Sequence, residues 1–590
     1  MSIDIETYRL KAQEAIEYVF VKEYHNSLGI PMPIVKMLLP DDANYSTGQY
    51  YITIDKTWQI HLNFGKLPIS YHEFQNEVKV LTRHEIEHYM CCPFDVITHF
   101  RMLKRIRDVY YKHFSHLGIN IEYACGAISN QAADIIVDTK NYYRHSKETL
   151  KSEIDWIKIG ANISACPRHC KLMFLTKEAI WKEDLGINET DPEFLKIVHQ
   201  LADSFTKNGI EDKSSFLDKV EEYAEIFFKL YVEDQKNPQQ SSQQGSQQQS
   251  GQQGPQQQSG QQGSQQQSGQ QGSQQQSGQQ GSQQQSGQWG VGRPKDGDEH
   301  GNAFVFADPD KVKEAIEVLA EETSVEEFID LLAIAGIIGM SDKQKGVLWF
   351  NVQSANIIPI VEFSNTGNKS SYTYPSVWRI GDPIEELDLM LTYMTSPRLI
   401  PGMTTKKWGY VSNDDNGTES KQMDLLLVVD TSGSMGSAMK ESANMHQAVL
   451  ASYGILSYFE STKSKVAFIG FSDKIDAYVD WSDKYDDVRE RLLTNGHGGT
   501  KFPISRIKST LDVRSRDLVT VLITNGDLGN INESVSYFRD YLNDDNKLYI
   551  FLLGGSKSLH SYEPLKNIGA KIYNANNANE FCDMVLTDME

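Results

Sequence analysis

The sequence predicts a multidomain protein with an N-terminal α+β domain, a Gln/Ser/Gly linker and a C-terminal doubly wound, Rossmann-like α/β domain. Three observations lead to this fold class. The chain has 590 residues, which is too many for a single hydrophobic core. The segment Pro238–Gln288 is almost entirely Gln, Ser and Gly. From Met423 onward, apolar strands alternate with helical segments, which is typical of a mainly parallel sheet.

The Gln/Ser/Gly segment repeats a nine-residue unit, GSQQQSGQQ. It has too few apolar side chains to offset the loss of chain entropy on folding, so we expect a disordered linker over residues 237–289. A self-associating Gln-rich segment is the alternative. The linker predicts one domain at 1–236, a lead-in region with helices and many strands at 290–421, and a last domain at 422–590.

Composition excludes several classes of protein. The formal net charge is -22, which disfavours binding to nucleic acid or to an anionic membrane surface. The N-terminus lacks the basic and apolar stretches of a secretory signal. The longest apolar run, Leu331–Met340, is half of the roughly 20 residues that span a bilayer. Six cysteines in a chain of this length do not indicate a disulfide scaffold, so we expect a cytoplasmic protein.

The first domain mixes strands and helices. Three segments read as short strands: PIVKMLL, GQYYITI and WQIHLNF, which end at Phe64. A helix is expected before them, over residues 8–24. After them we expect a helical stretch that stops near Pro93, and then helices over 95–114, 131–146 and 217–234.

The second half begins with two expected helices, 308–322 and 324–336, the latter opened by a capping box of Ser324 and Glu327. Three segments then read as strands of the lead-in region: VLWFNV, IIPIVEF and YPSVWRIGD. The α/β domain follows, with a helix over 438–459 and with strands over 423–430, 465–472, 517–524 and 547–555.

The first candidate site lies in the segment LTRHEIEHYM, where His84 and His88 are four residues apart and Glu85 follows the first histidine. On a helix, both imidazoles face the same side, and they continue an apolar stripe that includes Phe74 and Val78. Buried imidazoles need partners, and a zinc ion provides one for both. Glu85 can then accept a proton from the metal-bound water. The alternative is a polar helix surface with no metal.

A third protein ligand is needed, and the segment SNQAADIIVDTKN offers Asp134. Asn130 and Asp138 fall on the same helical face, where they can hydrogen-bond the ligands. Periodicity alone fits a solvated polar face equally well. Cys91 and Cys92 are rival ligands, because they lie three and four residues after His88.

A second cysteine-containing segment, CPRHC at Cys166–Cys170, is a candidate for half of a metal site. It has three residues between its cysteines and no partner pair elsewhere in the chain, so we interpret these cysteines as packing residues.

The segments RHEIEHYMCCP and QAADIIVD together resemble the zincin-like metallopeptidase domain that precedes bacterial von Willebrand factor A domains. In that group, an aspartate on an Ala-Asp-containing helix is the third zinc ligand. The resemblance implies that His84, His88 and Asp134 hold zinc, and that Glu85 is the catalytic base. It covers residues 5–150.

The second candidate site follows the strand MDLLLVVD. A carboxylate and two hydroxyls at alternate positions suit a cation that prefers oxygen ligands, such as magnesium. Parallel strands gather ligands at their carboxyl ends, so later loops can add to this set. The alternative is a polar turn that caps a helix. The candidate ligands are Asp430, Ser432, Ser434, Thr500, Asn525 and Asp527.

These segments, over Met423–Asp588, resemble the von Willebrand factor A (VWA) domain and its metal-ion-dependent adhesion site. The resemblance implies a divalent cation, Mg²⁺ or another, that binds a carboxylate of a protein partner. Asn525 stands where the family usually has aspartate, so one negative charge is missing, and Asp527 is a candidate to replace it.

Two functions are compatible with these sites. The first is a zinc-dependent peptidase, with its substrate paired as an extra strand beside WQIHLNF and delivered through the VWA domain. The second is a non-catalytic adaptor in which the zincin fold is structural or recognises without cutting. Proteins of this type resemble partners of MoxR-like AAA+ ATPases, which implies an ATPase of that class as the partner.

Overall fold

The computed structural model describes seventeen segments of the chain. They cover residues 5–25, 28, 30–40, 50–54, 59–64, 70–159, 163–236, 309–337, 340–355, 372–377, 406–410, 423–514, 517–526, 528, 530–544, 546–554 and 559–575. The expected linker at 237–289 lies outside these segments, as does the expected strand IIPIVEF.

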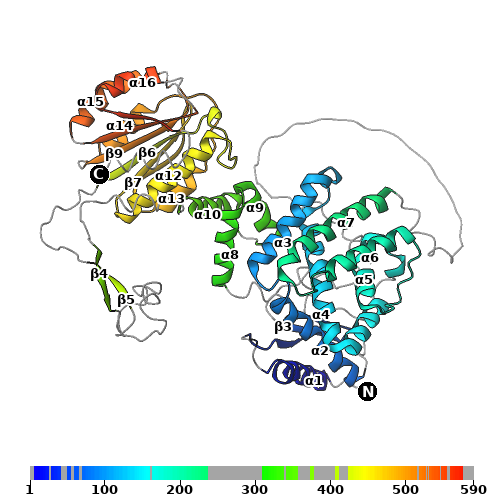
Figure 1. Cartoon of the computed structure of the whole chain (residues 1–590). Helices are drawn as coiled ribbons and strands as arrows, with labels where there is room; N and C mark the ends of the chain where they lie inside the picture. The colour runs from blue at the N-terminus through cyan, green and yellow to red at the C-terminus, as the bar shows by residue number, and fades with distance from the viewer. Residues whose placement is uncertain are drawn as a thin grey trace, which may run out of the picture. The chain divides into compact units, whose positions relative to one another are not determined.

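The chain forms two compact units (Figure 1). The first unit is Met1–Ile316 with Ala333–Gly336, and the second is Glu317–Leu332 with Ile337–Glu590. The first unit is mainly helical, with one small sheet, and the second has a large mixed sheet with helices, so the expected multidomain α+β and α/β organisation is confirmed at that level.

The first unit contains three strands and seven long helices among its described residues before the linker. Their bounds are α1 (Ile5–Glu17), β1 (Ile34–Met37), β2 (Tyr50–Ile54), β3 (Gln59–Phe64), α2 (Tyr71–Met90), α3 (Val96–Val109), α4 (Ile121–Ile159), α5 (Arg168–Trp181), α6 (Pro192–Thr206) and α7 (Phe216–Lys236). The three strands and the helices expected from sequence are present. α1 and α3 each continue into a short π-helical turn, Tyr18–Glu23 and Tyr110–Phe114.

The small sheet has the order β1-β3-β2, with β1 parallel and β2 antiparallel to β3. The strand β3 is therefore paired on both sides, by Ile34–Met37 and by Tyr50–Ile54. The expectation that a substrate adds as a strand beside WQIHLNF is wrong, because the backbone groups of that strand are already used. Alternation had indicated a half-buried strand, but alternation does not tell a central strand from an edge strand.

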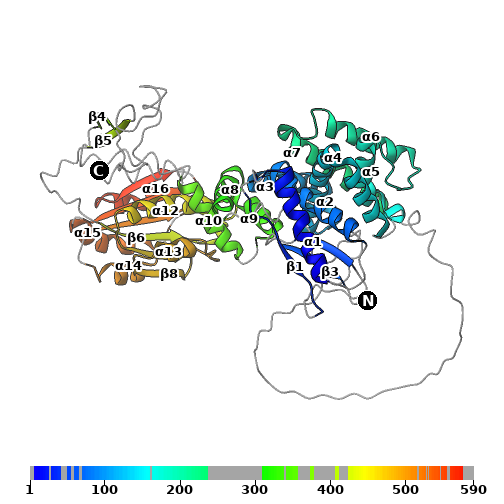
Figure 2. The same ribbon diagram turned by 90° about the horizontal axis from the view of Figure 1, so that it is seen from below.

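A capping box of Ser70 and Glu73 fixes where α2 begins. The Ser70 hydroxyl accepts a hydrogen bond from the Glu73 amide, at 3.4 Å, and donates to the Glu73 carboxylate. Phe74 and Val78 then face a core that also contains Ile60 and Leu62 of β3 and side chains of α1. α1 packs against α2 and β1 (Figure 2). α2 ends at Met90, three residues before Pro93, as expected from sequence.

α4 is the longest helix and the centre of the helical part of this unit. It packs against α2, α3, α5 and α7. Its helical backbone is interrupted at His145, eleven residues after Asp134. Contact with α2 over the stretch near Asp134 is what brings two distant sequence motifs together.

The second unit is built around a six-stranded sheet. The bounds of its elements are α8 (Pro309–Glu322, which begins within the residues of the first unit), α9 (Val325–Ile334), α10 (Asp342–Ala355), β4 (Tyr372–Val377), β5 (Lys406–Tyr410), β6 (Asp424–Asp430), α12 (Asn444–Ser461), β7 (Val466–Phe471), β8 (Ile475–Ser482), α13 (Tyr485–Leu492), α14 (Ile504–Leu511), β9 (Leu518–Thr524), α15 (Val535–Asn543), β10 (Lys547–Leu553), α16 (Leu559–Lys566) and β11 (Lys571–Ala575).

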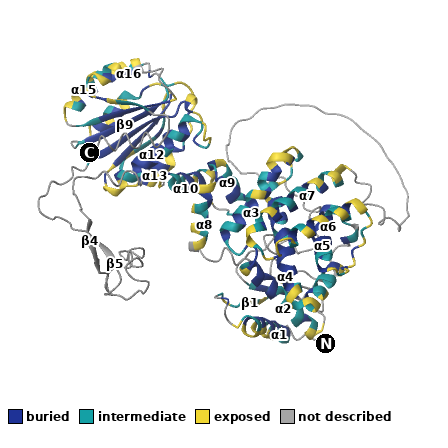
Figure 3. Cartoon of the chain, viewed as in Figure 1, coloured by how far each residue is buried: buried dark blue, intermediate teal, exposed yellow. Residues whose placement is uncertain are grey.

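The sheet order is β11-β10-β9-β6-β7-β8, and every neighbouring pair is parallel except β7 with β8. The chain moves outward from β6 to β7 and β8, and then crosses to β9 on the other side of β6. The switch point of this doubly wound sheet therefore lies between β6 and β9. Every residue of these two strands is buried, and Figure 3 shows the strands at the centre of the sheet in dark blue. One sheet face packs on α14, α15 and α16, and α12 packs on β6.

The segment VLWFNV, expected as a strand, is part of the helix α10, so that prediction is wrong. The buried residues of α10 include Gly346, Trp349 and Phe350, whose spacing is helical. Gly346 allows a close approach, because a Cβ there would lie 2.7 Å from the Met439 side chain. Trp349 donates its indole N–H to the carbonyl of Thr323, at 2.9 Å. A six-residue apolar run fits a buried helix as well as a strand, and only the packing against α12 decides between them.

The lead-in region is more helical than expected. Its described residues form the helices α8, α9 and α10 and one two-stranded antiparallel sheet, β4 with β5. The start of YPSVWRIGD is in β4. α9 has the expected cap, with the Glu327 amide donating to the Ser324 hydroxyl at 3.2 Å. The helix expected over 438–459 begins six residues later, at Asn444.

Candidate functional site

α2 presents both histidines of the first motif toward one point. Their Nε2 atoms are 3.1 Å apart, and the two rings meet edge to face with centroids 4.6 Å apart. Both side chains are buried, although they belong to a polar residue type. Two buried imidazoles whose Nε2 atoms converge need a shared partner for those nitrogens.

Asp134 of α4 completes this arrangement. Its Oδ1 atom lies 3.5 Å from His84 Nε2 and 3.3 Å from His88 Nε2. A tetrahedral ion with ligands at about 2.0–2.2 Å separates neighbouring ligand atoms by roughly 3.3–3.6 Å, close to the three distances observed. Oδ1 is buried and has no hydrogen bond of ordinary geometry with the described residues. These three side chains can hold a metal ion, and we call them the histidine site.

Hydrogen bonds behind the ligands fix their orientation. His84 Nδ1 donates to Asp138 Oδ1 at 2.6 Å, and His88 Nδ1 donates to the Cys92 carbonyl at 2.8 Å. Asn130 donates its side-chain amide to Asp134 Oδ2 at 3.1 Å. Because each Nδ1 is used in this way, each Nε2 keeps its lone pair for a cation. The supporting roles expected for Asn130 and Asp138 match these contacts.

Lys177 of α5 is a member of this network that sequence reasoning missed. Its ammonium lies 2.5 Å from Asp138 Oδ2 and 2.9 Å from Glu153 Oε1. The side chain is 2% exposed, so both ion pairs are within the protein interior. The available signal was a lysine within the apolar stretch LMFLTKEAIW, but only the fold shows which acids it contacts.

The ionisable groups of the histidine site shift one another strongly in the absence of a cation. Burial opposes charge on His84, but Asp138 and Asp134 raise its pKa well above the usual value. Burial likewise opposes charge on Asp138, but Lys177 and His84 lower the pKa of that carboxyl to about 2. The pKa of Asp134 is lowered by the two histidines against the same effect of burial. Both carboxylates are therefore anionic at neutral pH, as a metal site requires.

Glu85 differs from the other acid of the same helix turn. It is 5% exposed, and it forms no hydrogen bond or ion pair with any described residue. Glu87 is also buried, but it contacts Lys140 at 2.8 Å, Arg144 at 2.7 Å and the Tyr24 hydroxyl at 2.9 Å. Glu85 is therefore a buried carboxylate in the same helix turn as the candidate ligands, without a counter-ion among the described residues.

The cysteines proposed as alternative ligands do not join this site. Cys91 and Cys92 are buried, and among the described His, Cys, Asp and Glu side chains the group that converges as metal ligands consists of His84, His88 and Asp134. Cys92 contributes its backbone carbonyl instead. Burial raises the pKa of the Cys91 thiol to about 11, which disfavours the thiolate that a metal needs.

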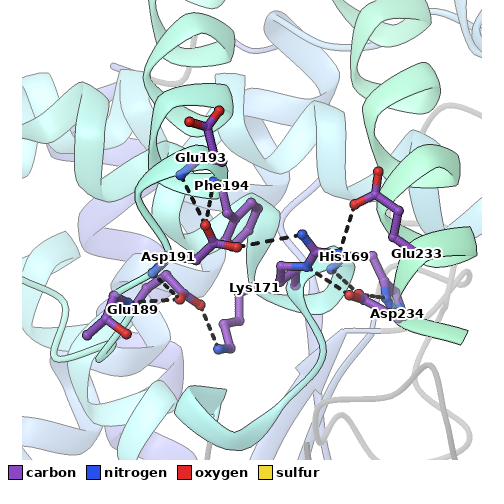
Figure 4. Close-up of polar contacts among 10 residues, drawn as sticks. His169, Lys171, Glu189, Asp191, Glu193, Phe194, Glu233 and Asp234 are labelled. Atoms are coloured by element: carbon purple, nitrogen blue, oxygen red, sulfur yellow. Dashed lines mark hydrogen bonds and ion pairs between the residues drawn. The ribbon is translucent and has the colours of Figure 1, made fainter. Parts of the chain in front are cut away.

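The segment CPRHC begins α5, and its histidine has a structural partner. Figure 4 shows His169 beside Asp234, and the Nδ1–Oδ2 distance is 2.8 Å. Arg168 contacts Asp234 at 2.9 Å, and Lys171 contacts Glu189 at 2.8 Å. These ion pairs tie the start of α5 to α7 and to the loop before α6. That Cys166 and Cys170 are packing residues rather than half a metal site stays a prediction.

The second candidate site lies at the switch point of the large sheet. Asp430 ends β6 and is fully buried, accepting hydrogen bonds from the Ser432 amide at 2.9 Å and from the Thr524 hydroxyl at 2.6 Å. The hydroxyls of Ser432 and Ser434 are 3.1 Å apart. Asn525 follows β9, and its Oδ1 accepts from the Ser434 hydroxyl at 3.1 Å. We call Asp430, Ser432, Ser434 and Asn525 the hydroxyl site.

Asn525 makes two contacts with the same residue. Besides accepting from the Ser434 hydroxyl, it donates its side-chain amide to the Ser434 carbonyl at 2.8 Å. An aspartate cannot make the second bond, so the amide holds the turn after β6 without adding negative charge. Thr500 is partly buried, in a loop whose Gly498 carbonyl accepts from the Gly433 amide at 3.3 Å. Asp527 lies outside the described residues.

The doubly wound sheet with oxygen donors at its switch point, and the helical unit with a His-His-Asp cluster, define two unrelated kinds of candidate metal site. The chain matches no protein-family model, and a search of curated proteins finds no significant match. Among the described residues, none of the helices has the length and apolar character that crossing a membrane demands.

Proposed function

We propose that the first unit is a zincin-like, zinc-dependent peptidase domain, with His84, His88 and Asp134 as the metal ligands. The observation that carries this proposal is the near-equilateral set of two Nε2 atoms and one carboxylate oxygen, buried and fixed from behind. Two nitrogens and one oxygen leave one position of a tetrahedral ion open, which is the arrangement of catalytic rather than structural zinc.

The residues of this chain divide the work as follows. Zinc in the histidine site supplies a Lewis acid that polarises water and a carbonyl oxygen. Glu85, adjacent to His84 and without a counter-ion among the described residues, accepts the proton of the attacking water and passes it to the leaving amine. Asp138 and Lys177 keep the His84 ring oriented and its Nε2 directed to the ion.

The test is a comparison of the zinc-loaded full chain with its Glu85→Gln variant, using fluorescein-labelled casein and a quenched peptide library as substrates. We expect zinc binding to stay within about twofold, and hydrolysis to fall by roughly 10²–10⁴-fold, the usual contribution of a general base. Glu122→Gln, on an exposed position of α4, is the matched control and should keep full activity. Hydrolysis that survives Glu85→Gln, or a zinc-loaded chain that cleaves neither substrate, would reject the peptidase proposal.

We further propose that the second unit carries a VWA domain, which binds a protein partner through a divalent cation at the hydroxyl site. The supporting observation is that the carboxylate, hydroxyls and amide meet at the switch point between β6 and β9, where doubly wound sheets bind ligands. Octahedral Mg²⁺ keeps positions open for water or for a carboxylate of the partner.

If the histidine site does not hydrolyse peptides, the protein is an adaptor that acts with an AAA+ ATPase of the MoxR-like class. The experiment is affinity capture by the full chain with a purified ATPase of that class, in Mg²⁺ and in EDTA. Capture should require Mg²⁺ and should be lost in Asp430→Ala. Capture that is unchanged by both treatments would show that the hydroxyl site is not where this partner binds.

A further inference from the structure

A groove of about 450 Å³ opens in the second unit. Its basic side chains are Lys474 from the turn between β7 and β8, Lys501 from the loop before α14, and Arg506 from α14 itself. Ile475, which is 38% exposed, gives it an apolar part. We call this feature the basic groove.

Backbone hydrogen bonds connect the basic groove to the hydroxyl site. The Lys501 amide donates to the Ser472 carbonyl at 2.7 Å, which joins the loop before α14 to the end of β7. Two residues before Thr500 in the same loop, the Gly498 carbonyl accepts from Gly433 in the turn between Ser432 and Ser434. A Cβ on Gly498 would lie 3.2 Å from the Asp473 carboxylate. One loop therefore lines the groove and also contacts the turn that contains Ser432 and Ser434.

That loop is held in place from its other side. Asn530 accepts a hydrogen bond from the Phe502 amide at 2.9 Å and donates to the Phe502 carbonyl at 3.0 Å. The Phe502 ring is 2% exposed and packs in the core of the unit. The groove is thus a pre-formed surface, which lowers the cost of ordering side chains when a ligand binds.

The charges in the basic groove are unusual for this protein. Lys474, Lys501 and Arg506 are exposed, and none of them forms an ion pair with a described residue. The Arg506 guanidinium lies 3.7 Å from the centre of the Tyr478 ring, which orients it without neutralising it. Asp473 is the one acidic lining residue, so three cations and one carboxylate leave +2 in a chain of net charge -22. Unpaired cations gathered in a hollow favour an anionic ligand.

We propose that the basic groove binds acidic side chains of a partner protein, next to the carboxylate that binds at the hydroxyl site. This inference rests on the proposed function of that site, and it adds the chemistry of the partner: an extended segment with Asp or Glu next to the metal-binding acid. The apolar part formed by Ile475 suits a peptide with aliphatic side-chain stems better than a nucleic-acid backbone. Acidic neighbours give orientation and rate of association beyond what a single carboxylate on the ion provides.

The experiment measures fluorescence anisotropy of two labelled nine-residue peptides with the full chain in Mg²⁺. Both have a central Asp; one carries Glu at the flanking polar positions, and the other carries Gln. We expect the Glu peptide to bind roughly five- to tenfold more tightly, because each exposed ion pair contributes modestly. The triple variant K474Q/K501Q/R506Q should bind the Glu peptide as weakly as the Gln peptide. The control K484Q/R539Q/K566Q changes the net charge equally on other exposed positions of the unit and should keep the preference.

Each outcome decides for or against the basic groove. Equal binding of the two peptides, a preference that survives the triple variant, or a loss of preference in the control as well would overturn the inference. Tighter binding of a labelled oligothymidylate than of the Glu peptide would also overturn it. A preference for the Glu peptide that persists in EDTA and in Asp430→Ala, but is lost in the triple variant, supports the groove and contradicts the proposed metal-dependent site. Metal-dependent binding of both peptides with no preference keeps the proposed site and rejects the groove.

Discussion

The histidine site and the hydroxyl site differ most in how far they are removed from water. The first has three buried ligands, two of them imidazoles, each oriented by a further hydrogen bond or ion pair. The second has one fully buried carboxylate, while Ser434 is exposed and Asn525 is only partly buried. A buried nitrogen-rich site holds a borderline-soft ion tightly, whereas an open oxygen site exchanges a hard ion and its ligands. The first arrangement suits chemistry at a fixed ion, and the second suits reversible contact with a partner.

The largest expected effect is that of His88→Ala on zinc. Structural-type zinc sites bind with about 10–16 kcal/mol, so losing one of a few ligands should weaken binding by roughly 10²–10⁴-fold. Zinc content and competition with a chromogenic chelator measure this effect. Mg²⁺ binding by the second unit should not change. If His88→Ala keeps one zinc per chain at unchanged affinity, the histidine site is not the zinc site.

Lys177→Met tests whether the buried network supports the histidine site. The change leaves Glu153 buried without its cation and leaves Asp138 with only the His84 imidazole as a partner, which should destabilise the first unit by about 3–5 kcal/mol. Chemical denaturation, followed by the fluorescence of tryptophans in that unit, measures the change. The control is Lys229→Met, whose exposed i,i+4 pair with Glu225 should contribute less than about 0.5 kcal/mol. Equal effects of the two changes would contradict the network.

Asp430→Ala should weaken Mg²⁺ binding by at least about tenfold, because it removes the buried carboxylate of the hydroxyl site. Calorimetric titration with Mg²⁺ measures the effect, and Asp540→Ala, at an exposed position of α15, is the control. Zinc content should remain the same in both variants. A loss of zinc in Asp430→Ala would mean that the two sites are not independent, and the contrast between them would fail.

Asn525→Asp should have the smallest effect and a particular sign. The added charge should strengthen Mg²⁺ binding by roughly threefold, because an exposed site screens a unit charge strongly. The variant also loses the bond from the Asn525 amide to the Ser434 carbonyl, which opposes the gain. Weaker Mg²⁺ binding in Asn525→Asp would show that holding the turn matters more than charge at this position.

The sequence by itself determined the local pieces: helical spacing of His84, Glu85 and His88, the three strands before them, the alternating strands of the α/β domain, and Asp134 as a candidate ligand. These features depend on short-range periodicity, so a linear pattern contains them. Asp134 lies 50 residues from His84 in the sequence, and the pattern of its segment fits a solvated helix face equally well. Only the packing of α4 on α2 shows that Asp134 faces the histidines.

Tertiary structure alone decided the remaining points. The segment VLWFNV is helical because its ring side chains pack against α12. The strand β3 is central because β1 and β2 pair on its two sides. Lys177 reaches the histidine site because α5 packs on α4. The β7–β8 turn, the loop before α14 and α14 itself bring three cations together in one groove. Burial and long-range pairing depend on which segments meet in space, and a periodic pattern in the chain does not contain that choice.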